Sequence, residues 1–155
     1  MDTDEVKDQE EASGDALVEQ GRTYLRRGAD LFDAGEHHAS HEVFEAAWLA
    51  ARGGGREAEA YWWQGLVLCA GALHHRGKGN QKGALALRER ALDRLGTALR
   101  LAGDVGCAGA WWVAPCEAWV AAWRAVSLDD TYDDALNASK VADPRLKELL
   151  AHGGS

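Results

Sequence analysis

The sequence predicts an all-α protein, a single bundle of about five helices joined by short loops. Apolar residues recur at intervals of three and four along five segments, and no segment shows the alternation that is typical of a half-buried strand. Only two prolines occur in 155 residues, Pro115 and Pro144, so long stretches are free to be helical. Hydrophobic residues make up 46% of the chain and include seven tryptophans, which is enough for a substantial core.

The N-terminal residues 1–13 are predicted to form a disordered acidic tail. The first twelve residues hold six Asp or Glu side chains and one Lys, with almost nothing apolar, and such segments cannot bury enough surface to fold. The helical bundle domain is then expected over residues 14–128. Residues 129–155 are expected to form a C-terminal extension with one short helix between Pro144 and His152.

The first two predicted helices are separated by a tight reversal. The first starts at an N-cap, Ser13 or Asp15, and runs to about Ala34, where Gly35 permits the chain to turn. The second covers about residues 37–52, and three consecutive glycines follow it. Short connections of this kind place consecutive helices side by side.

The three remaining helices carry most of the large apolar side chains. The third, about residues 57–76, is apolar on almost every face and is therefore expected at the centre of the bundle. Asn80 is a good N-cap for a fourth helix that ends near Leu101. The fifth, about residues 110–126, places four side chains on one face: Trp112, Cys116, Trp119 and Trp123.

Charge and composition exclude several classes of protein. The formal net charge is −8 and no basic stripe is present, so we expect no binding to nucleic acid. The longest apolar run, residues 60–73, is too short to cross a membrane. The acidic N-terminus is unlike a signal peptide. Three cysteines without metal-type spacing, Cys69, Cys107 and Cys116, indicate reduced thiols and a cytoplasmic location.

Five polar or aromatic side chains in two neighbouring helices are candidates for a site. His41, Glu45 and Trp48 share one face of the second helix because they are spaced by four and three residues. Gln64 and His75 share one face of the third helix. If the two helices pack antiparallel, all five side chains are expected to converge between them.

This cluster has three interpretations, which the residues alone leave open. It can be a ligand-binding or catalytic pocket. It can be a buried structural network, in which case Glu45→Ala would cost about 1–3 kcal/mol by leaving His41 unsatisfied. It can also be a metal site with His41, Glu45 and His75 as ligands and Glu42 as a base. The string HHASHE matches neither HExxH nor HxxEH, so we expect no peptidase chemistry. We expect no tightly bound metal, because His37 and His38 compete as ligands at the same end and no cysteine supports the site, and we expect no other cofactor.

The segment from about residue 31 to residue 95 resembles a small bacterial and archaeal family known as domain of unknown function 309. The resemblance rests on an ordered series of motifs: Gly35, the HEVFE element at 41–45, Trp48, the QGL element at 64–66, His75, Gly79-Asn80 and Gly83-Ala84. It implies an all-helical bundle and no particular activity. The family often has a second Gln where this chain has Leu68, which implies a less polar pocket here.

Three functions are compatible with these observations. The first is a small non-enzymatic module that binds a small ligand or a protein partner, a second copy of the chain included. The second is a metal-dependent hydrolase that uses the same cluster. The third is an interaction protein that uses its Trp-rich fifth helix, with the polar cluster purely structural. Exposure discriminates them, because an open cluster favours the first two and a sealed one favours the third.

Overall fold

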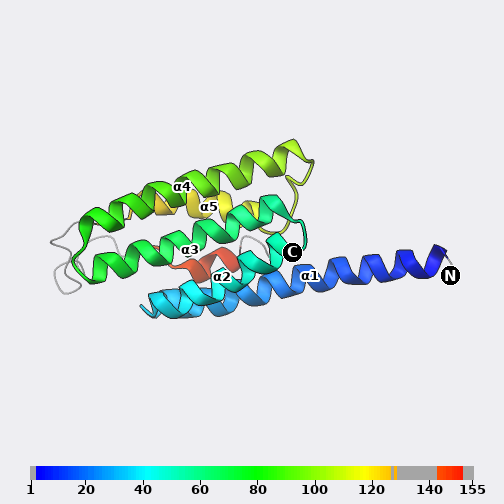
Figure 1. Ribbon diagram of the computed structural model, residues 1–155, viewed down its shortest axis with the longest axis horizontal. Helices are drawn as coiled ribbons and strands as arrows, with labels where there is room; N and C mark the ends of the chain where they lie inside the picture. Colours follow the sequence, from blue (N-terminus) through cyan, green and yellow to red (C-terminus); the bar gives the residue numbers. More distant parts are fainter. Residues whose placement is uncertain (1–2, 127, 129–142, 152–155) are drawn as a thin grey trace.

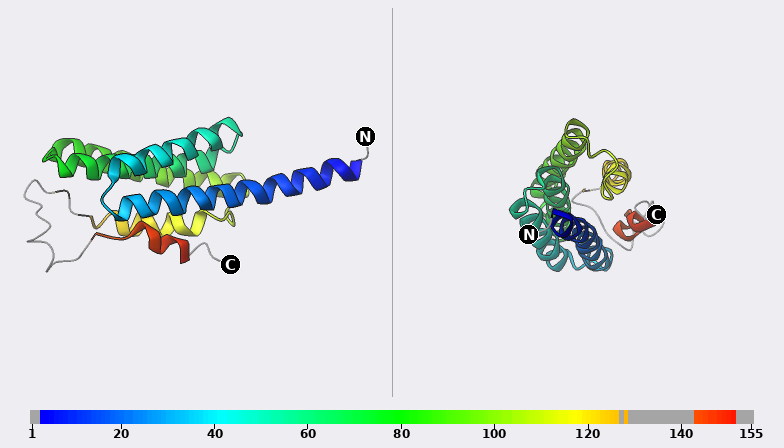
Figure 2. Two further views of the ribbon diagram at one scale, coloured as in Figure 1. Left: turned by 90° about the horizontal axis from the view of Figure 1, so that it is seen from below. Right: turned by 90° about the vertical axis from the view of Figure 1, so that its right-hand side faces the viewer.

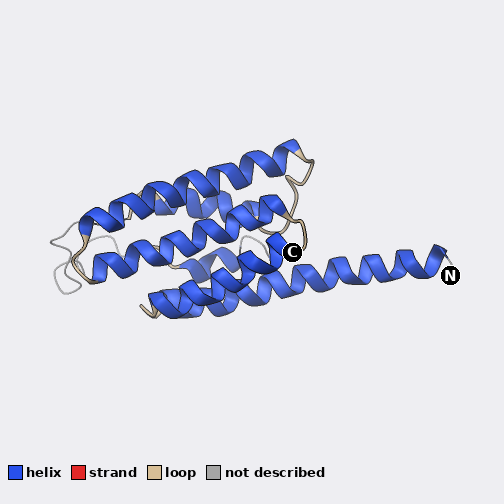
Figure 3. Cartoon of the chain, viewed as in Figure 1, coloured by secondary structure: helices blue, strands red, loops and turns tan. Residues whose placement is uncertain are grey.

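The computed structural model describes residues 3–126, 128 and 143–151. These residues form five α-helices and one short 3₁₀ helix (Figure 1): α1 (Thr3–Asp33), α2 (His37–Gly53), α3 (Glu57–Gly77), α4 (Gln81–Asp104), α5 (Val113–Trp123) and η1 (Leu146–Ala151). None of the described residues lies in a strand (Figure 3). The predicted all-α bundle is confirmed.

Each α-helix packs against the one that follows it in the chain. Helix α1 contacts α2, α2 contacts α3, α3 contacts α4, and α4 contacts α5 (Figures 1 and 2). The short helix η1 packs against α1 and α5. Helix α3 therefore lies between α2 and α4, and its buried residues point in several directions around its axis. A helix without a wide polar face needs neighbours on more than one side, so the predicted central position is confirmed.

Glycines end the first four helices. One glycine with a positive φ angle follows each of them: Gly35, Gly55, Gly79 and Gly106. Glycine adopts this conformation without the steric cost that a Cβ atom brings. At the start of α4, the side-chain oxygen of Asn80 accepts a hydrogen bond of 3.0 Å from the backbone N–H of Gly83, which confirms the predicted N-cap.

The start of α1 differs from the sequence prediction. The backbone of α1 is helical from Thr3, so the predicted start at Ser13 or Asp15 is wrong, and residues 3–13 differ from the disorder predicted for them. Acidic residues stabilise the N-terminal end of a helix dipole, and no proline interrupts this segment. This end of α1 extends beyond the other helices (Figures 1 and 2). The boundaries proposed at residues 14, 128 and 129 stay predictions.

Helix α5 is shorter than predicted, Val113–Trp123 in place of residues 110–126. Pro115 has no backbone N–H, so it fits only in the first turn of a helix, and this limits where α5 can begin. The predicted apolar face of α5 is buried in the core: Trp112, Cys116, Trp119 and Trp123 are at most 2% exposed. These four side chains therefore pack in the interior of the bundle.

The core also contains Cys69, which the sequence placed in an apolar helix. The Sγ atom of Cys69 accepts a hydrogen bond of 3.4 Å from the indole Nε1 of Trp119. Burial raises the pKa of this thiol well above its usual range. The thiolate, which is the reactive form, is thus disfavoured, and Cys69 packs as an apolar residue. Among the helices of the described chain, none has the length and apolar character that a membrane span requires.

Candidate functional site

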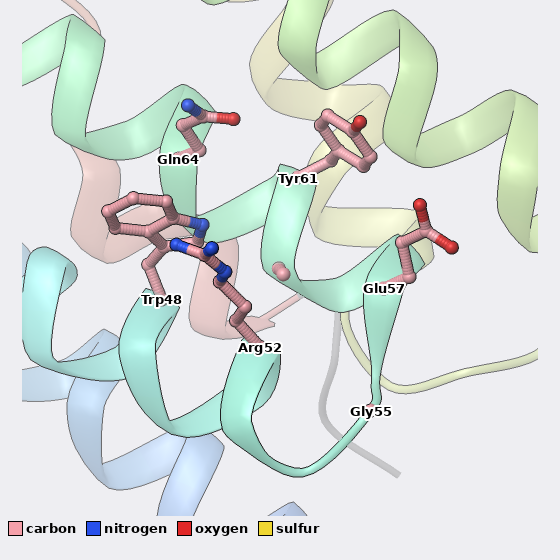
Figure 4. A pocket seen from close by; sticks show the side chains of 7 residues that line it. Trp48, Arg52, Gly55, Glu57, Tyr61 and Gln64 are labelled. Carbon is pink, nitrogen blue, oxygen red and sulfur yellow. The ribbon is translucent and has the colours of Figure 1, made fainter.

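A pocket of about 430 Å³ lies where the end of α2 turns into the start of α3 (Figure 4). Seven residues line it: Trp48, Arg52, Gly55, Glu57, Ala60, Tyr61 and Gln64. Ligand pockets in proteins usually have volumes of about 300–1,000 Å³ and combine apolar walls with a few polar groups. Two of the five residues predicted from the sequence, Trp48 and Gln64, belong to this pocket.

Helix α2 contributes an aromatic wall with a cation on it. Trp48 and Arg52 are one helical turn apart, and the guanidinium carbon of Arg52 lies 5.6 Å from the centroid of the Trp48 ring. This is a cation–π contact, and Figure 4 shows the two side chains together on the α2 side of the pocket. The contact restrains the guanidinium at the pocket while its N–H groups stay free of other side chains in the described part of the chain.

Helix α3 contributes the polar groups on the other side of the pocket. Glu57, Tyr61 and Gln64 are spaced by four and three residues, so they lie on one face of α3. Ala60 is buried beneath them. Within the described residues, neither these three side chains nor the Trp48 indole N–H forms a hydrogen bond or an ion pair. The pocket therefore offers donors and acceptors that the protein itself does not use.

His41 and Glu45 lie outside this pocket and are more open to solvent than predicted. His41 Nδ1 is 3.6 Å from Glu45 Oε2, and the two side chains are 35% and 46% exposed. The interpretation of these two residues as a buried pair is therefore not supported by their exposure. The side chains that α2 buries in the core include Phe44 and Ala47, and His41 and Glu45 lie beside this buried face, where the helix borders on solvent.

Glu45→Ala is accordingly expected to change the free energy of unfolding by less than about 0.5 kcal/mol. Exposed ion pairs at this spacing on a helix contribute only a few tenths of a kcal/mol. Urea denaturation followed by circular dichroism measures the effect, with Glu42→Ala on the same helix as a control. A loss of more than 1 kcal/mol at Glu45 alone would contradict the exposed geometry.

His75 lies at the opposite end of α3 from the pocket. Its Nδ1 atom is 3.0 Å from the side-chain nitrogen of Asn80, in the turn that leads to α4. Across the helix pair, the His38 ring lies 6.2 Å from the His74 ring. The antiparallel packing of α2 and α3 thus brings histidines together at one end and Trp48 and Gln64 together at the other, so the five predicted residues do not form one site.

The predicted metal-ligand set is not assembled either. In the part of the chain that the structure describes, no three His, Cys, Asp or Glu side chains are arranged so that they could hold a metal ion. This applies to His41, Glu45 and His75, which all lie in that part. A hydrolase mechanism that depends on these three ligands therefore has no support from their positions.

His37 is partly buried at this end of the bundle. Its ring packs edge-on against Phe32 of α1, with 5.6 Å between the ring centroids. Burial, and then the positive charge of Arg76, lower the pKa of His37, while the Asp143 carboxylate raises it. The charged and titratable groups that act on this imidazole come from the residue before α2, from α3 and from the segment before η1: Glu36, His74, Arg76 and Asp143.

The lowered pKa of His37 predicts that the protein loses stability in mild acid. The unfolded chain binds a proton at His37 more tightly than the folded protein does. The free energy of unfolding is therefore highest above about pH 7, and it declines as the pH falls below 6.5, the ordinary pKa of histidine. Melting temperatures between pH 7.5 and 5 should fall less in His37→Gln than in the parent protein. His38→Gln, at a side chain that is 76% exposed, should behave like the parent, and equal slopes in all three proteins would contradict the prediction.

Three of the pocket residues, Arg52, Glu57 and Tyr61, were not predicted as site residues. The helical spacing of these residues in the sequence could have identified them. Arg52 continues the face of α2 that holds Trp48, four residues further on, and Tyr61 and Glu57 continue the face of α3 that holds Gln64. The pocket is thus a continuation of the predicted faces towards the loop between the two helices.

Comparison with known protein families gives a match over part of the chain. The model of a family described as a domain of unknown function (DUF309) matches residues 25–87. The matched segment includes α2, α3 and every residue that lines the pocket. The resemblance found in the sequence is thereby confirmed for this segment. No curated protein and no solved structure matches the chain.

Proposed function

We propose that this chain, whose residues 25–87 belong to the DUF309 family, is a module that binds a small organic ligand in the pocket between α2 and α3. The ligand has a planar apolar part, which contacts the Trp48 ring, and a carboxylate, which the Arg52 guanidinium binds. Guanidinium groups match carboxylates in shape and charge. Tyr61 and Gln64 supply hydrogen bonds that orient the ligand.

The observation that carries this proposal is the set of unused polar groups in one pocket. Polar groups on a protein surface are commonly satisfied by water, but these converge on a cavity with an aromatic wall. An aromatic wall with a few converging polar groups is the usual composition of a ligand site. The pocket is also the place where two of the residues predicted from the sequence meet.

A titration of ¹⁵N-labelled protein with benzoate tests the proposal, because benzoate is the simplest planar carboxylate. We expect chemical-shift changes centred on the Trp48 indole N–H, the Gln64 side-chain amide and the Gly55 backbone N–H. Arg52→Met should weaken binding by roughly 10- to 100-fold, since a hydrogen bond to a charged group contributes about 1.5–3 kcal/mol. Trp48→Ala should weaken it as well.

Two matched variants separate the pocket from general effects. Arg100→Met removes one exposed positive charge from α4, and Leu49→Ala truncates the exposed neighbour of Trp48. Both should bind benzoate like the parent protein. Shift changes spread over the surface, or equal affinity in Arg52→Met and Arg100→Met, would overturn the proposal.

We also infer that the protein is located in the cytoplasm. The support is chemical, because Cys69, Cys107 and Cys116 are all free thiols, as is usual in a reducing compartment. The net charge of −8 likewise supports the absence of nucleic-acid binding. Cell fractionation with an antibody against the chain tests the location, and recovery in a secreted fraction would contradict it.

A further inference from the structure

The pocket between α2 and α3 contains two opposite charges that do not neutralise each other. Arg52 lines it from α2 and Glu57 lines it from α3. No ion pair within 4.0 Å joins the two side chains, and in the described part of the chain neither has another charged partner. The Arg52 guanidinium is instead placed against the Trp48 ring. Both charges therefore remain available to whatever enters the pocket.

Other charges on α2 and around the start of α3 form ion pairs. His38 Nε2 lies 3.2 Å from Glu42 Oε1, and Arg56 Nε lies 3.5 Å from Glu59 Oε1. Arg56 is next to Glu57 in the sequence, but it forms its ion pair with Glu59 and not with Glu57. The separation of Arg52 from Glu57 is thus a property of the pocket rather than of this surface in general.

We infer that the ligand is a zwitterion whose carboxylate binds Arg52 and whose ammonium group binds Glu57. This inference rests on the proposed binding site. A simple carboxylate would enter the pocket with the Glu57 carboxylate nearby, and a simple amine would meet the Arg52 guanidinium, so each is opposed by a like charge. A ligand with both groups meets two attractive charges, and specificity commonly combines such attraction and repulsion.

Glu57 also has a structural role that must be separated from ligand selection. It lies in the first turn of α3, together with Glu59, where a negative charge stabilises the helix dipole. A purely structural Glu57 would change stability when substituted but would leave the preference among ligands unchanged. The preference among ligands is therefore the decisive measurement.

Four probes distinguish these possibilities in the ¹⁵N titration at constant ionic strength. Benzoate carries the carboxylate alone and benzylamine carries the ammonium group alone. The zwitterions 4-(aminomethyl)benzoate and phenylalanine carry both groups, far apart and close together respectively. We expect at least one zwitterion to bind the parent protein ten times more tightly than benzoate, and we expect benzylamine to bind more weakly than benzoate.

Substitution of Glu57 and substitution of Arg52 should change the order of ligand affinities in different ways. In Glu57→Gln the advantage of the zwitterion over benzoate should disappear, while benzoate should bind as well as before or better. In Arg52→Gln both zwitterions and benzoate should weaken. Glu42→Gln, which removes an exposed charge of α2 outside the pocket, should keep the parent's preference.

The possible outcomes separate this inference from the proposed function. If benzoate binds at Trp48 and neither zwitterion binds more tightly, the ligand is a simple carboxylate, and the inference fails while the binding site stands. If the zwitterion is preferred equally in the parent and in Glu57→Gln, the role assigned to Glu57 is wrong. If no probe shifts the pocket resonances, both the inference and the proposed function fail.

Discussion

Trp63→Ala is expected to lower the free energy of unfolding by about 3–5 kcal/mol, the range typical of truncating a large buried aromatic side chain. Trp63 is 1% exposed. Its ring lies about 6 Å, between centroids, from four other aromatic rings: Tyr24 at 6.3 Å, Phe44 at 6.2 Å, Trp62 at 5.9 Å and Trp111 at 6.0 Å. These rings come from α1, α2, α3 and the segment before α5, so the loss of one indole loosens several packing contacts at once.

The loss at Trp63 has a polar component as well. The indole Nε1 donates a hydrogen bond of 3.1 Å to Glu59 Oε2. Trp63→Phe keeps an aromatic ring but removes this donor, so its cost should be smaller than that of Trp63→Ala. Urea denaturation of both variants, followed by circular dichroism, measures the two components. Trp48→Ala is the control for a half-buried tryptophan, and a loss at Trp63 no greater than at Trp48 would contradict the central position of Trp63.

The helices could be predicted from the sequence because their signals are local. Apolar spacing gave α2 and α3 almost to the residue and the start of α4, while α4 continues beyond the predicted end near Leu101 to Asp104. The glycines at 35, 55 and 79 mark the helix ends through their own backbone preference. The start of α1 could not be predicted from the same signals. Charge density favours disorder, whereas acidic residues at a helix N-terminus favour helix, and the sequence does not decide between two such opposing effects.

The candidate site was predicted in part, and the error has a physical cause. The face of α2 that holds Trp48 and the face of α3 that holds Gln64 were correctly paired by helical spacing. The chemistry was assigned to His41 and His75 because imidazole is a frequent catalytic and metal-binding group. Whether another element covers a helix face depends on contacts between distant segments of the chain. The spacing of residues within one helix gives no information about such contacts.

Two helical glycines, Gly28 and Gly96, are predicted to respond in opposite ways to a side chain. Substitution by alanine should lower the stability of the protein at Gly28 and raise it at Gly96. A Cβ atom at Gly28 of α1 would overlap Cε1 of Phe44, a ring of α2 that is fully buried. The contact between α1 and α2 therefore depends on the absence of this atom. Gly96 lies in α4, is exposed, and a Cβ atom there would meet no heavy atom within 4 Å.

Gly28→Ala is expected to destabilise the protein by about 1–3 kcal/mol, because overpacking forces the Phe44 ring or the α1 backbone to move. Gly96→Ala is expected to stabilise it by up to about 1 kcal/mol, the difference in helix propensity between the two residues. Since the change in propensity is the same at both sites, the difference between the two variants isolates the cost of the steric contact. Combining Gly28→Ala with Phe44→Leu removes the obstructing ring, so the double variant should lose less stability than the sum of the two single losses. Equal stability of Gly28→Ala and Gly96→Ala in urea denaturation would show that α1 and α2 are not packed as closely as this contact requires.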